Sequence, residues 1–157
     1  MMVKRDIRLA TLADLALMHE WVNADDSLKW KKDTKHIISR EEHAEWFQSR
    51  LADPVTQIWI ILDDDAPSGQ VRLEKKGDLV YVDIYVVAGV RGTGLAGFAL
   101  NESINRYTKL FGSQRFCAIV SPENKMSEKL FVKNGFQKDE YEPENWSRFT
   151  RFERSSA

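Results

Sequence analysis

The feature that most constrains the fold is a glycine-rich loop that joins a strand pattern directly to a helical pattern. Residues 80–87 form the longest β-favouring run in the chain, rich in β-branched and aromatic residues, which is typical of a strand. After the loop, apolar residues recur at helical spacing from Leu95 until about Gly112. Glycines let the backbone come close to a ligand, and the free N–H groups at a helix N-terminus bind anions. Residues 86–96 therefore predict a pyrophosphate site, and the alternative is a tight strand-to-helix turn without a ligand.

The other predicted elements place this loop inside a single α+β domain. Two helices follow a first strand and begin at the capping residues Thr11 and Ser39. Residues 63–69 are predicted as a turn and residues 23–38 as irregular. The predicted strands are 5–9, 58–62, 70–73, 80–87, 116–120, 136–141 and 147–153, and the later helices are 95–112 and 125–133. We expect one domain, residues 1–157, of the α+β (α/β three-layer) class, with a mainly antiparallel mixed sheet of six to seven strands flanked by about four helices.

Composition and charge exclude several classes of protein. Lysine and arginine number 23 against 24 aspartate and glutamate, so the net charge is -1 and no basic excess exists to bind nucleic acid. No run approaches the roughly 20 apolar residues of a membrane span and no signal peptide is recognisable, so the cytoplasm is the expected location. The three histidines show no metal-ligand spacing, and we expect no metal. Cys117, in an apolar run, is predicted to be a buried core residue rather than a nucleophile.

Two motifs at a fixed separation point to one family. They are Arg91-x-x-Gly94-x-Ala96 after the long strand, and Asn124 followed by a helix that ends in Phe131-x-x-x-Gly135-Phe136. Together they resemble the signature of the GCN5-related N-acetyltransferases, and the resemblance extends from about Ile7 to Phe136. It implies the fold of that family, acetyl-CoA as cosubstrate, and transfer of the acetyl group to a small-molecule amine acceptor.

The resemblance also implies how acetyl-CoA is held. The backbone of the central strand would pair with the pantetheine arm as if it were an added strand. A bulge in that strand normally splays it from the strand at 116–120. Backbone N–H groups of the loop would hold the pyrophosphate, Asn124 would reach the pantetheine or acetyl end, and the helix carrying Phe131 would flank the thioester. The implied cofactor-binding residues are Tyr85, Val86, Val87, Arg91, Gly92, Thr93, Gly94, Leu95, Ala96, Asn124 and Phe131.

The catalytic groups depart from the family pattern. Many members have a tyrosine at the position of Phe131, where the hydroxyl protonates the departing thiolate, and phenylalanine cannot do so. Ser127, one helical turn earlier, or a water would then supply the proton. Tyr81 and Ile119 occupy the positions at which some relatives carry a glutamate base. Asp83 is either the general base or the structural partner of an arginine or lysine, and His43 is a further candidate.

The N-terminal half contains the residues expected to select the acceptor. Trp21-x-Asn23 and Glu41-Glu42-His43 resemble the pseudaminic acid pathway N-acetyltransferases, which act on nucleotide-linked amino sugars. That resemblance implies diphosphate contacts from basic residues and ring stacking from tryptophans, namely Lys29, Lys31, Lys32 or Arg40, and Trp30 or Trp46. The alternatives are a solvated basic loop, an acceptor that is a protein N-terminus or another small amine, a catalytically idle acyl-CoA-binding module, and an interaction domain. A homodimer is possible.

Overall fold

The protein forms one seven-stranded mixed sheet covered by helices on both faces. The structure is a computed structural model that describes residues 4–28, 37–139 and 146–155. The strands are β1 (Arg5–Leu9), β2 (Thr56–Asp63), β3 (Ala66–Lys76), β4 (Leu79–Val86), β5 (Gln114–Val120), β6 (Gln137–Asp139) and β7 (Ser147–Glu153), in the order β1-β2-β3-β4-β5-β7-β6. Only β4 and β5 pair in parallel among these strands. The predicted fold class is confirmed.

Five α-helices are described rather than about four. They are α1 (Leu15–Val22), α2 (Asp25–Leu28), α3 (Arg40–Ala52), α4 (Leu95–Phe111) and α5 (Lys125–Lys133), with short 3-10 helices at Leu12–Asp14 and Ala88–Val90. The additional helix is α2, a single turn inside the segment that was expected to be irregular. Four residues are too few for a hydrophobic period, so the sequence pattern could not identify it.

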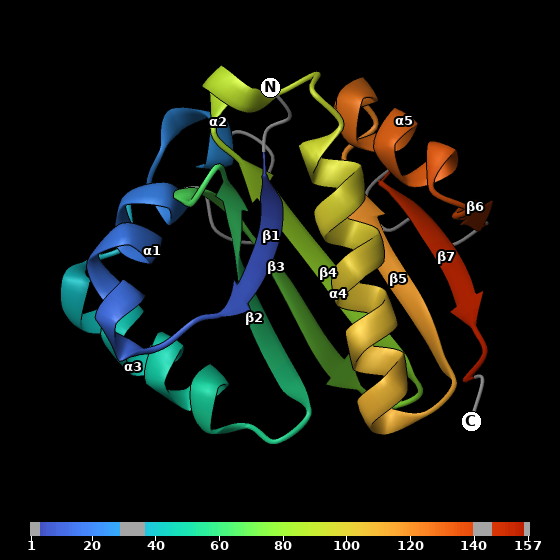
Figure 1. Ribbon diagram of the computed structural model, residues 1–157, viewed down its shortest axis with the longest axis horizontal. Coiled ribbons are helices and arrows are strands. Elements are labelled where there is room, and N and C mark those ends of the chain that lie inside the picture. Colours follow the sequence, from blue (N-terminus) through green and yellow to red (C-terminus); the bar gives the residue numbers. More distant parts are fainter. Residues whose placement is uncertain (1–3, 29–36, 140–145, 156–157) are drawn as a thin grey trace.

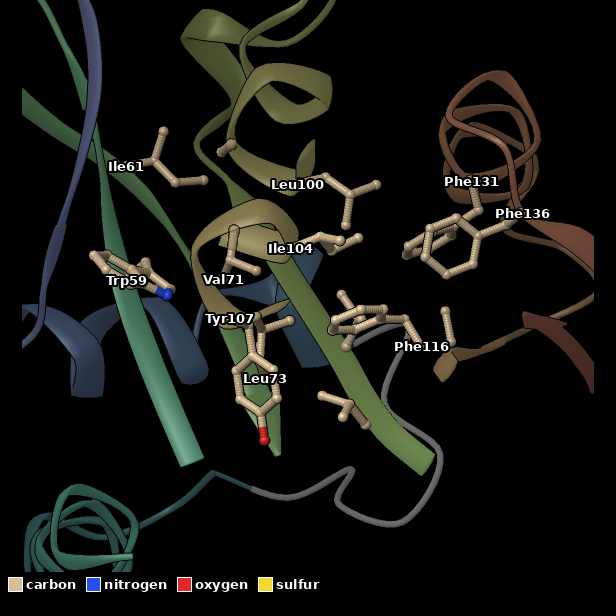
Figure 2. Packing of buried hydrophobic residues seen from close by; sticks show 14 of the residues in the cluster. Trp59, Ile61, Val71, Leu73, Leu100, Ile104, Tyr107, Phe116, Phe131 and Phe136 are labelled. Carbon is tan, nitrogen blue, oxygen red and sulfur yellow. The ribbon is translucent and has the colours of Figure 1, made fainter. Parts of the chain in front are cut away.

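Two hydrophobic cores lie on opposite faces of the sheet. On one face, Leu100, Ile104 and Tyr107 of α4 pack against Leu73 of β3 and Phe116 of β5 (Figure 2). On the other face, α1 and α3 contribute a second core that contains Met18, Trp21, Phe47, Ile58 and Ile60. In Figure 1, α4 crosses in front of the sheet, while α1 and α3 lie at the β1–β2 side. Strand β2 supplies both cores with alternate residues, which confirms the predicted burial of both of its faces.

The ends of the helices follow the capping signals in the sequence. The Thr11 side chain accepts a hydrogen bond in the first turn, and the Asp14 side chain accepts one from the Thr11 N–H, which completes a capping box. Ser39 caps α3 by accepting from the Glu42 N–H at 3.1 Å. Gly135, with φ +87°, follows α5 in the left-handed region. Cys117 is fully buried, and burial raises the pKa of its thiol to about 11, as expected for a core residue.

The hairpin between β2 and β3 corrects one prediction. The expected turn spanned residues 63–69, but the actual turn consists of Asp64 and Asp65, whose φ values are +51° and +70°. Two consecutive left-handed residues make a tight turn whose twist suits a hairpin, and aspartate tolerates that conformation better than most residues. Strand β3 therefore begins at Ala66 and is 11 residues long, well beyond the predicted 70–73.

Candidate active site

The parallel strands β4 and β5 separate part of the way along their length. Residues 79–81 of β4 pair with residues 115–117 of β5, and the pairing stops there. Residues 82–86 and 118–120 then line a cavity of about 840 Å³, together with the loop before α4, the start of α4, and α5. The cavity continues across the sheet to α1 and α3, where Trp21 and Trp46 form part of its wall.

The bulge that was expected to cause this separation does not occur between β3 and β4. All eight register pairs, from Gly69 opposite Val86 to Lys76 opposite Leu79, run without a shift. Strands β4 and β5 stop pairing after Tyr81 and Cys117, and their separation begins at that point. Sequence patterns do not encode the angle between two strands, so this detail came only from the resemblance.

The N-terminus of α4 is open to an anion. The side chains of Ser39 and Asn124 cap α3 and α5, whereas Gly94 at the start of α4 has no side chain with which to cap it. Gly92 and Gly94 have φ values of +79° and +87°, which side chains rarely adopt. The first-turn N–H groups of this 17-residue helix therefore face the cavity without a capping side chain, and the helix dipole adds to their attraction for phosphate.

Arg91 is held by a carboxylate that the sequence did not indicate. Its Nη2 lies 2.5 Å from Asp26 Oδ2, and its Nε donates to the Val86 carbonyl oxygen at 2.8 Å. The Tyr85 hydroxyl donates to the other Asp26 oxygen at 3.0 Å. Burial alone would raise the pKa of the Asp26 carboxyl group, but the hydrogen bonds from Arg91 and Tyr85 hold that pKa below its ordinary value. Part of the Arg91 charge is thus offset at the cavity wall.

A second arginine, Arg5 of β1, reaches the same loop. The Arg5 guanidinium donates to the Thr93 carbonyl oxygen and lines the cavity, and its Nη1 would lie 3.5 Å from a Cβ placed on Gly94. The Thr93 hydroxyl donates to the Val90 carbonyl oxygen at 2.6 Å, which ties the loop together. Arg5 therefore brings positive charge to the predicted pyrophosphate site.

The backbone of the central strand is only partly available to a ligand. The Val87 N–H donates to the Ser68 carbonyl oxygen at 2.9 Å, and the Val87 carbonyl accepts from Val90 at 3.2 Å. The Val86 carbonyl already accepts from Arg91. Tyr85 and Val86 line the cavity, and Val87 does not. Residues 82–86, which line the cavity beyond the last pair with β5, are therefore better placed than Val87 to pair with a pantetheine arm.

Helix α5 forms the other side of the cavity. Asn124, Ser127 and Phe131 all line it, as the resemblance implied. The Asn124 side-chain oxygen accepts from the Ser127 N–H at 3.2 Å, which uses that oxygen as the helix cap. Phe131 is buried and meets Phe136 edge-on at 5.0 Å between ring centroids (Figure 2).

Helices α4 and α5 are fixed to one another by a polar cluster of Asn101, Asn134 and Arg151. Asn101 donates to Asn134 Oδ1 at 2.7 Å, and Arg151 donates to Asn101 Oδ1 at 2.6 Å and to the Asn134 carbonyl at 3.0 Å. A Cβ on Gly97 would lie 3.3 Å from Asn134 Nδ2, so glycine permits this close approach. The cluster holds the two helices that flank the cavity at a fixed separation.

On the α1 and α3 side, the cavity wall mixes aromatic and polar side chains. Asp83 accepts from Gln70 Nε2 at 3.0 Å and lies 3.9 Å from Arg72 Nη1, so it has the structural partners that were one of its two predicted roles. Arg72 in turn lies 4.9 Å from the Trp46 ring centroid. Burial and the neighbouring His19 lower the pKa of His43, which keeps this imidazole neutral.

The remaining predicted residues fall in several places. Tyr81 pairs with Cys117 where the strands are still joined, and Ile119 lines the cavity. Arg40 is exposed and borders a separate small cavity. Lys29, Trp30, Lys31 and Lys32 lie outside the described residues. Within the described part of the chain, no helix is long and apolar enough to cross a membrane and no cluster of three potential metal ligands occurs; the absence of a metal stays a prediction.

Sequence patterns did not predict Arg5, Asp26 and Gln70 as residues of the site. Each comes from an element other than the loop, and each reaches the site only through sheet order or helix packing. Gln70 opens the alternating run Gln70-Val71-Arg72-Leu73, in which a polar residue at every second position is ordinary. A polar residue inside the alternating first strand and an acidic residue in an irregular segment carry no signal either.

Separated parallel strands beside an uncapped helix N-terminus form a cavity with an end suited to an anion. The chain belongs to the GNAT acetyltransferase family, because the sequence model of the acetyltransferase (GNAT) domain matches residues 6–137. Membership makes it an N-acetyltransferase by class. No protein of curated function matches the sequence.

Solved structures with the same fold cover nearly the whole chain. A domain from Methanocaldococcus jannaschii is 23% identical with a TM-score of 0.84, over 96% of this chain and 99% of that one. The spermidine N-acetyltransferase from Vibrio cholerae in complex with CoA and spermine is 17% identical with a TM-score of 0.79, over 97% and 96%. RimL, a ribosomal L7/L12 α-N-protein acetyltransferase in complex with CoA, is 14% identical with a TM-score of 0.77, over 94% and 93%. At these identities the likeness establishes the fold.

Proposed function

We propose that this protein transfers the acetyl group of acetyl-CoA to a primary amine by direct attack in a ternary complex. One observation carries the proposal: a single cavity joins the gap between β4 and β5, with the open α4 N-terminus, to a polar and aromatic wall formed by α1 and α3. Two substrates could therefore meet within one cavity. Two solved structures of the same fold are complexes with CoA, which supports acetyl-CoA as the cosubstrate.

The proposed acetyl-CoA site consists of the loop and the unpaired half of β4. The N–H groups at residues 91–96 would hold the pyrophosphate, with Arg5 adding charge. Residues 82–86 would pair with the pantetheine arm, and Asn124 and Phe131 would border the thioester. The bound cosubstrate supplies an acetyl carbon activated by a thiolate leaving group.

The proposed proton transfers depend on Asp83 and Ser127. An amine must lose a proton to attack, and Asp83 is the acidic residue of β4 that lines the cavity. A carboxylate at this position could accept the proton through a water. Ser127, one turn before Phe131 on the cavity side of α5, would deliver a proton to the thiolate; a thiol pKa near 8.5 makes this assistance modest.

For the acceptor we propose an amino-sugar nucleotide, on the strength of the Trp21-x-Asn23 and Glu41-Glu42-His43 motifs. Trp21, Trp46 and His43 line the cavity, which supports an acceptor on this side. The solved relatives named above act on spermidine and on a protein N-terminus, and both acceptors are alternatives, as is an idle module that binds acetyl-CoA without turnover. One domain over residues 1–157, the cytoplasmic location and a homodimer stay predictions.

The decisive experiment is calorimetric titration of acetyl-CoA into the protein and into the Gly94→Asp variant. Aspartate would add a strained side chain and a negative charge at the open helix end, so we expect micromolar binding to fall at least about tenfold. Gly77→Asp is the control, because Gly77 also has a positive φ, +63°, with open space around it in a distant turn. We expect it to bind acetyl-CoA normally.

Acceptors are then screened by release of CoA, beginning with UDP-linked 4-amino sugars, spermidine and a peptide N-terminus. The full proposal is supported if the amino sugar gives the largest kcat/KM of these acceptors. Failure of the unaltered protein to bind acetyl-CoA would refute it, and binding without turnover of any amine would leave the idle module.

A further inference from the structure

We infer that His43 and Gln70 together bind an uncharged polar group of the acceptor. This group is a hydroxyl or an amide next to the amine, and each of the two residues forms a hydrogen bond to it. The inference rests on the proposed function and narrows its acceptor class. It separates hydroxyl- or amide-bearing amines from polyamines, whose chains offer only amines and methylene groups.

The first observation is a set of buried polar atoms without partners. Among the residues that the structure describes, four buried side-chain atoms have no hydrogen-bond partner: Nδ1 and Nε2 of His43, Oε1 of Gln70 and Oγ1 of Thr108. His43 is 2% exposed and Gln70 is 5% exposed, and both line the main cavity. Thr108 does not line it. Unpaired buried polar atoms destabilise a fold, so their concentration at one cavity wall indicates a ligand that completes them.

The second observation is that side chains of α3 reach β3 at this cavity wall. Arg50 of α3 contacts Glu74 of β3, and Trp46 stacks against Arg72. His43 lies about one helical turn before Trp46 on α3, and Gln70 lies two residues before Arg72, on the same face of β3. All four of His43, Trp46, Gln70 and Arg72 line the same cavity.

The chemistry of the pair suits a neutral polar group. Burial and the nearby His19 keep His43 uncharged, so its ring offers one N–H donor and one nitrogen acceptor. The Gln70 Nε2 group donates to Asp83, which directs the other end of the amide, an acceptor oxygen, away from that bond. A hydroxyl or an amide both donates and accepts, and so can satisfy an imidazole and a carbonyl oxygen together.

The acidic residues of the wall do not favour a polycation. Asp26 and Asp83 are the carboxylates that line the cavity in the described part of the chain, and each is paired with an arginine, Arg91 or Arg72. His43 also borders a smaller cavity of about 220 Å³ with His19 and Arg40, which adds a basic group rather than an acidic one. Recognition by hydrogen bonds is therefore favoured over recognition of extra positive charges.

The test compares two cyclic primary amines, glucosamine and cyclohexylamine, in the wild type and in His43→Phe and Gln70→Leu. Phenylalanine keeps the ring contacts of His43 with Trp46 and Phe47 at 5.7 Å and 5.9 Å while removing both nitrogens. We expect the ratio of kcat/KM for glucosamine to that for cyclohexylamine to fall about tenfold in each variant, mainly through the KM for glucosamine. Differences in amine basicity cancel, because the same ratio is compared between proteins.

Stability and cofactor binding distinguish recognition from a structural role. Acetyl-CoA affinity should stay within about twofold in both variants. The Tm of His43→Phe should be unchanged or higher, because replacing an unpaired buried polar group with an apolar one is neutral or stabilising. The Tm of Gln70→Leu should fall slightly, because leucine also removes the hydrogen bond from Gln70 Nε2 to Asp83. Thr108→Val is the matched control: it removes the fourth unpaired atom away from the cavity, and its amine selectivity should equal that of the wild type.

Two results would overturn the inference. One is an unchanged selectivity ratio in both variants, and the other is acetylation of neither amine, or of cyclohexylamine preferentially, by wild-type protein that binds acetyl-CoA. Failure of the wild type to bind acetyl-CoA would instead refute the proposed function itself. Failure of the inference and failure of the proposed function are therefore distinguishable.

Discussion

The side chain at position 131 has no hydroxyl, so the proton for the departing thiolate must come from elsewhere. Ser127 lies one helical turn earlier and lines the same cavity. We predict that Ser127→Ala lowers kcat about tenfold and leaves the acetyl-CoA Kd unchanged. The effect is smaller than the 10²–10⁴ usual for a general acid, because a thiolate leaves without much assistance near neutral pH. Steady-state kinetics with calorimetry measures both quantities.

Ser121→Ala serves as the control for this prediction. Ser121 also lines the cavity, and its hydroxyl accepts from the Glu123 N–H at 3.4 Å outside the α5 helix. Its kcat should match that of the wild type. In the Ser127→Ala background, Phe131→Tyr should restore part of the activity by supplying a hydroxyl. Equal kcat for Ser127→Ala and wild type would show that water, not Ser127, delivers the proton.

The sequence predicted the positions of some site residues and not those of others. The positions of Gly94 and Asn124 at the starts of two helices were predictable, because helix starts have local sequence signals. Their contacts with a ligand stay predictions. The direction of the Arg91 side chain was not predictable, because it depends on Asp26, which is 65 residues away in the chain. Asp83 was predicted to be either a base or a structural partner, and its contacts with Arg72 and Gln70 confirm that it has partners while its catalytic role stays a prediction.

At the scale of elements, the junction between β1 and α1 depends on Asp14. Its carboxylate accepts from Arg8 at 2.9 Å through both oxygens and from the Thr11 N–H at 2.9 Å. The hydrogen bonds from Arg8 lower the pKa of Asp14 despite its burial, and the Thr11 N–H lowers it further. We predict that Asp14→Asn destabilises the protein by about 1–2 kcal/mol at pH 7.

The pH dependence of this variant follows from the lowered pKa. The ionised carboxylate stabilises the fold fully above the unfolded pKa near 3.9, and this contribution disappears as the pH falls through the lower folded value. The difference between wild type and Asp14→Asn should therefore be constant from pH 7 to about 5 and shrink below about pH 4. Urea unfolding at several pH values measures it. Asp65→Asn, at an exposed pair with Lys4, should show no difference at any pH.

Elements with strong local signals were predicted closely, and those set by tertiary pairing were not. Helix α5 has the predicted bounds, 125–133, because Asn124 caps its start and Gly135 ends it. Strand β3 is longer than predicted because its first residues are extended by pairing with β2. In the sequence alone, Pro67 and Gly69 are typical of a turn. The separation of β4 from β5 is likewise a property of two strands together, and no single segment carries it.

For the molecule as a whole, the sheet divides the site between its two faces. The core under α4 supports the proposed cofactor loop, and the core under α1 and α3 supports the proposed acceptor wall, while β4 contributes alternate residues to both. Val82 and Val86 belong to the first core, whereas Tyr85 packs against the second. A ligand between β4 and β5 would therefore contact the strand that both faces share.

This arrangement predicts where acetyl-CoA slows hydrogen exchange. We expect saturating acetyl-CoA to protect amides at residues 82–96 and 118–127 strongly at early exchange times, because these segments line the cavity and include the uncapped helix end. Helix α3 and strand β1, apart from Arg5, should change little at those times. Binding also stabilises the whole fold by mass action, about 2.7 kcal/mol at 100 times the Kd, but that slows only amides that exchange through global unfolding, at late times. Uniform early protection across the molecule would contradict the division of the site, and mass-spectrometric exchange with peptide resolution decides between the two patterns.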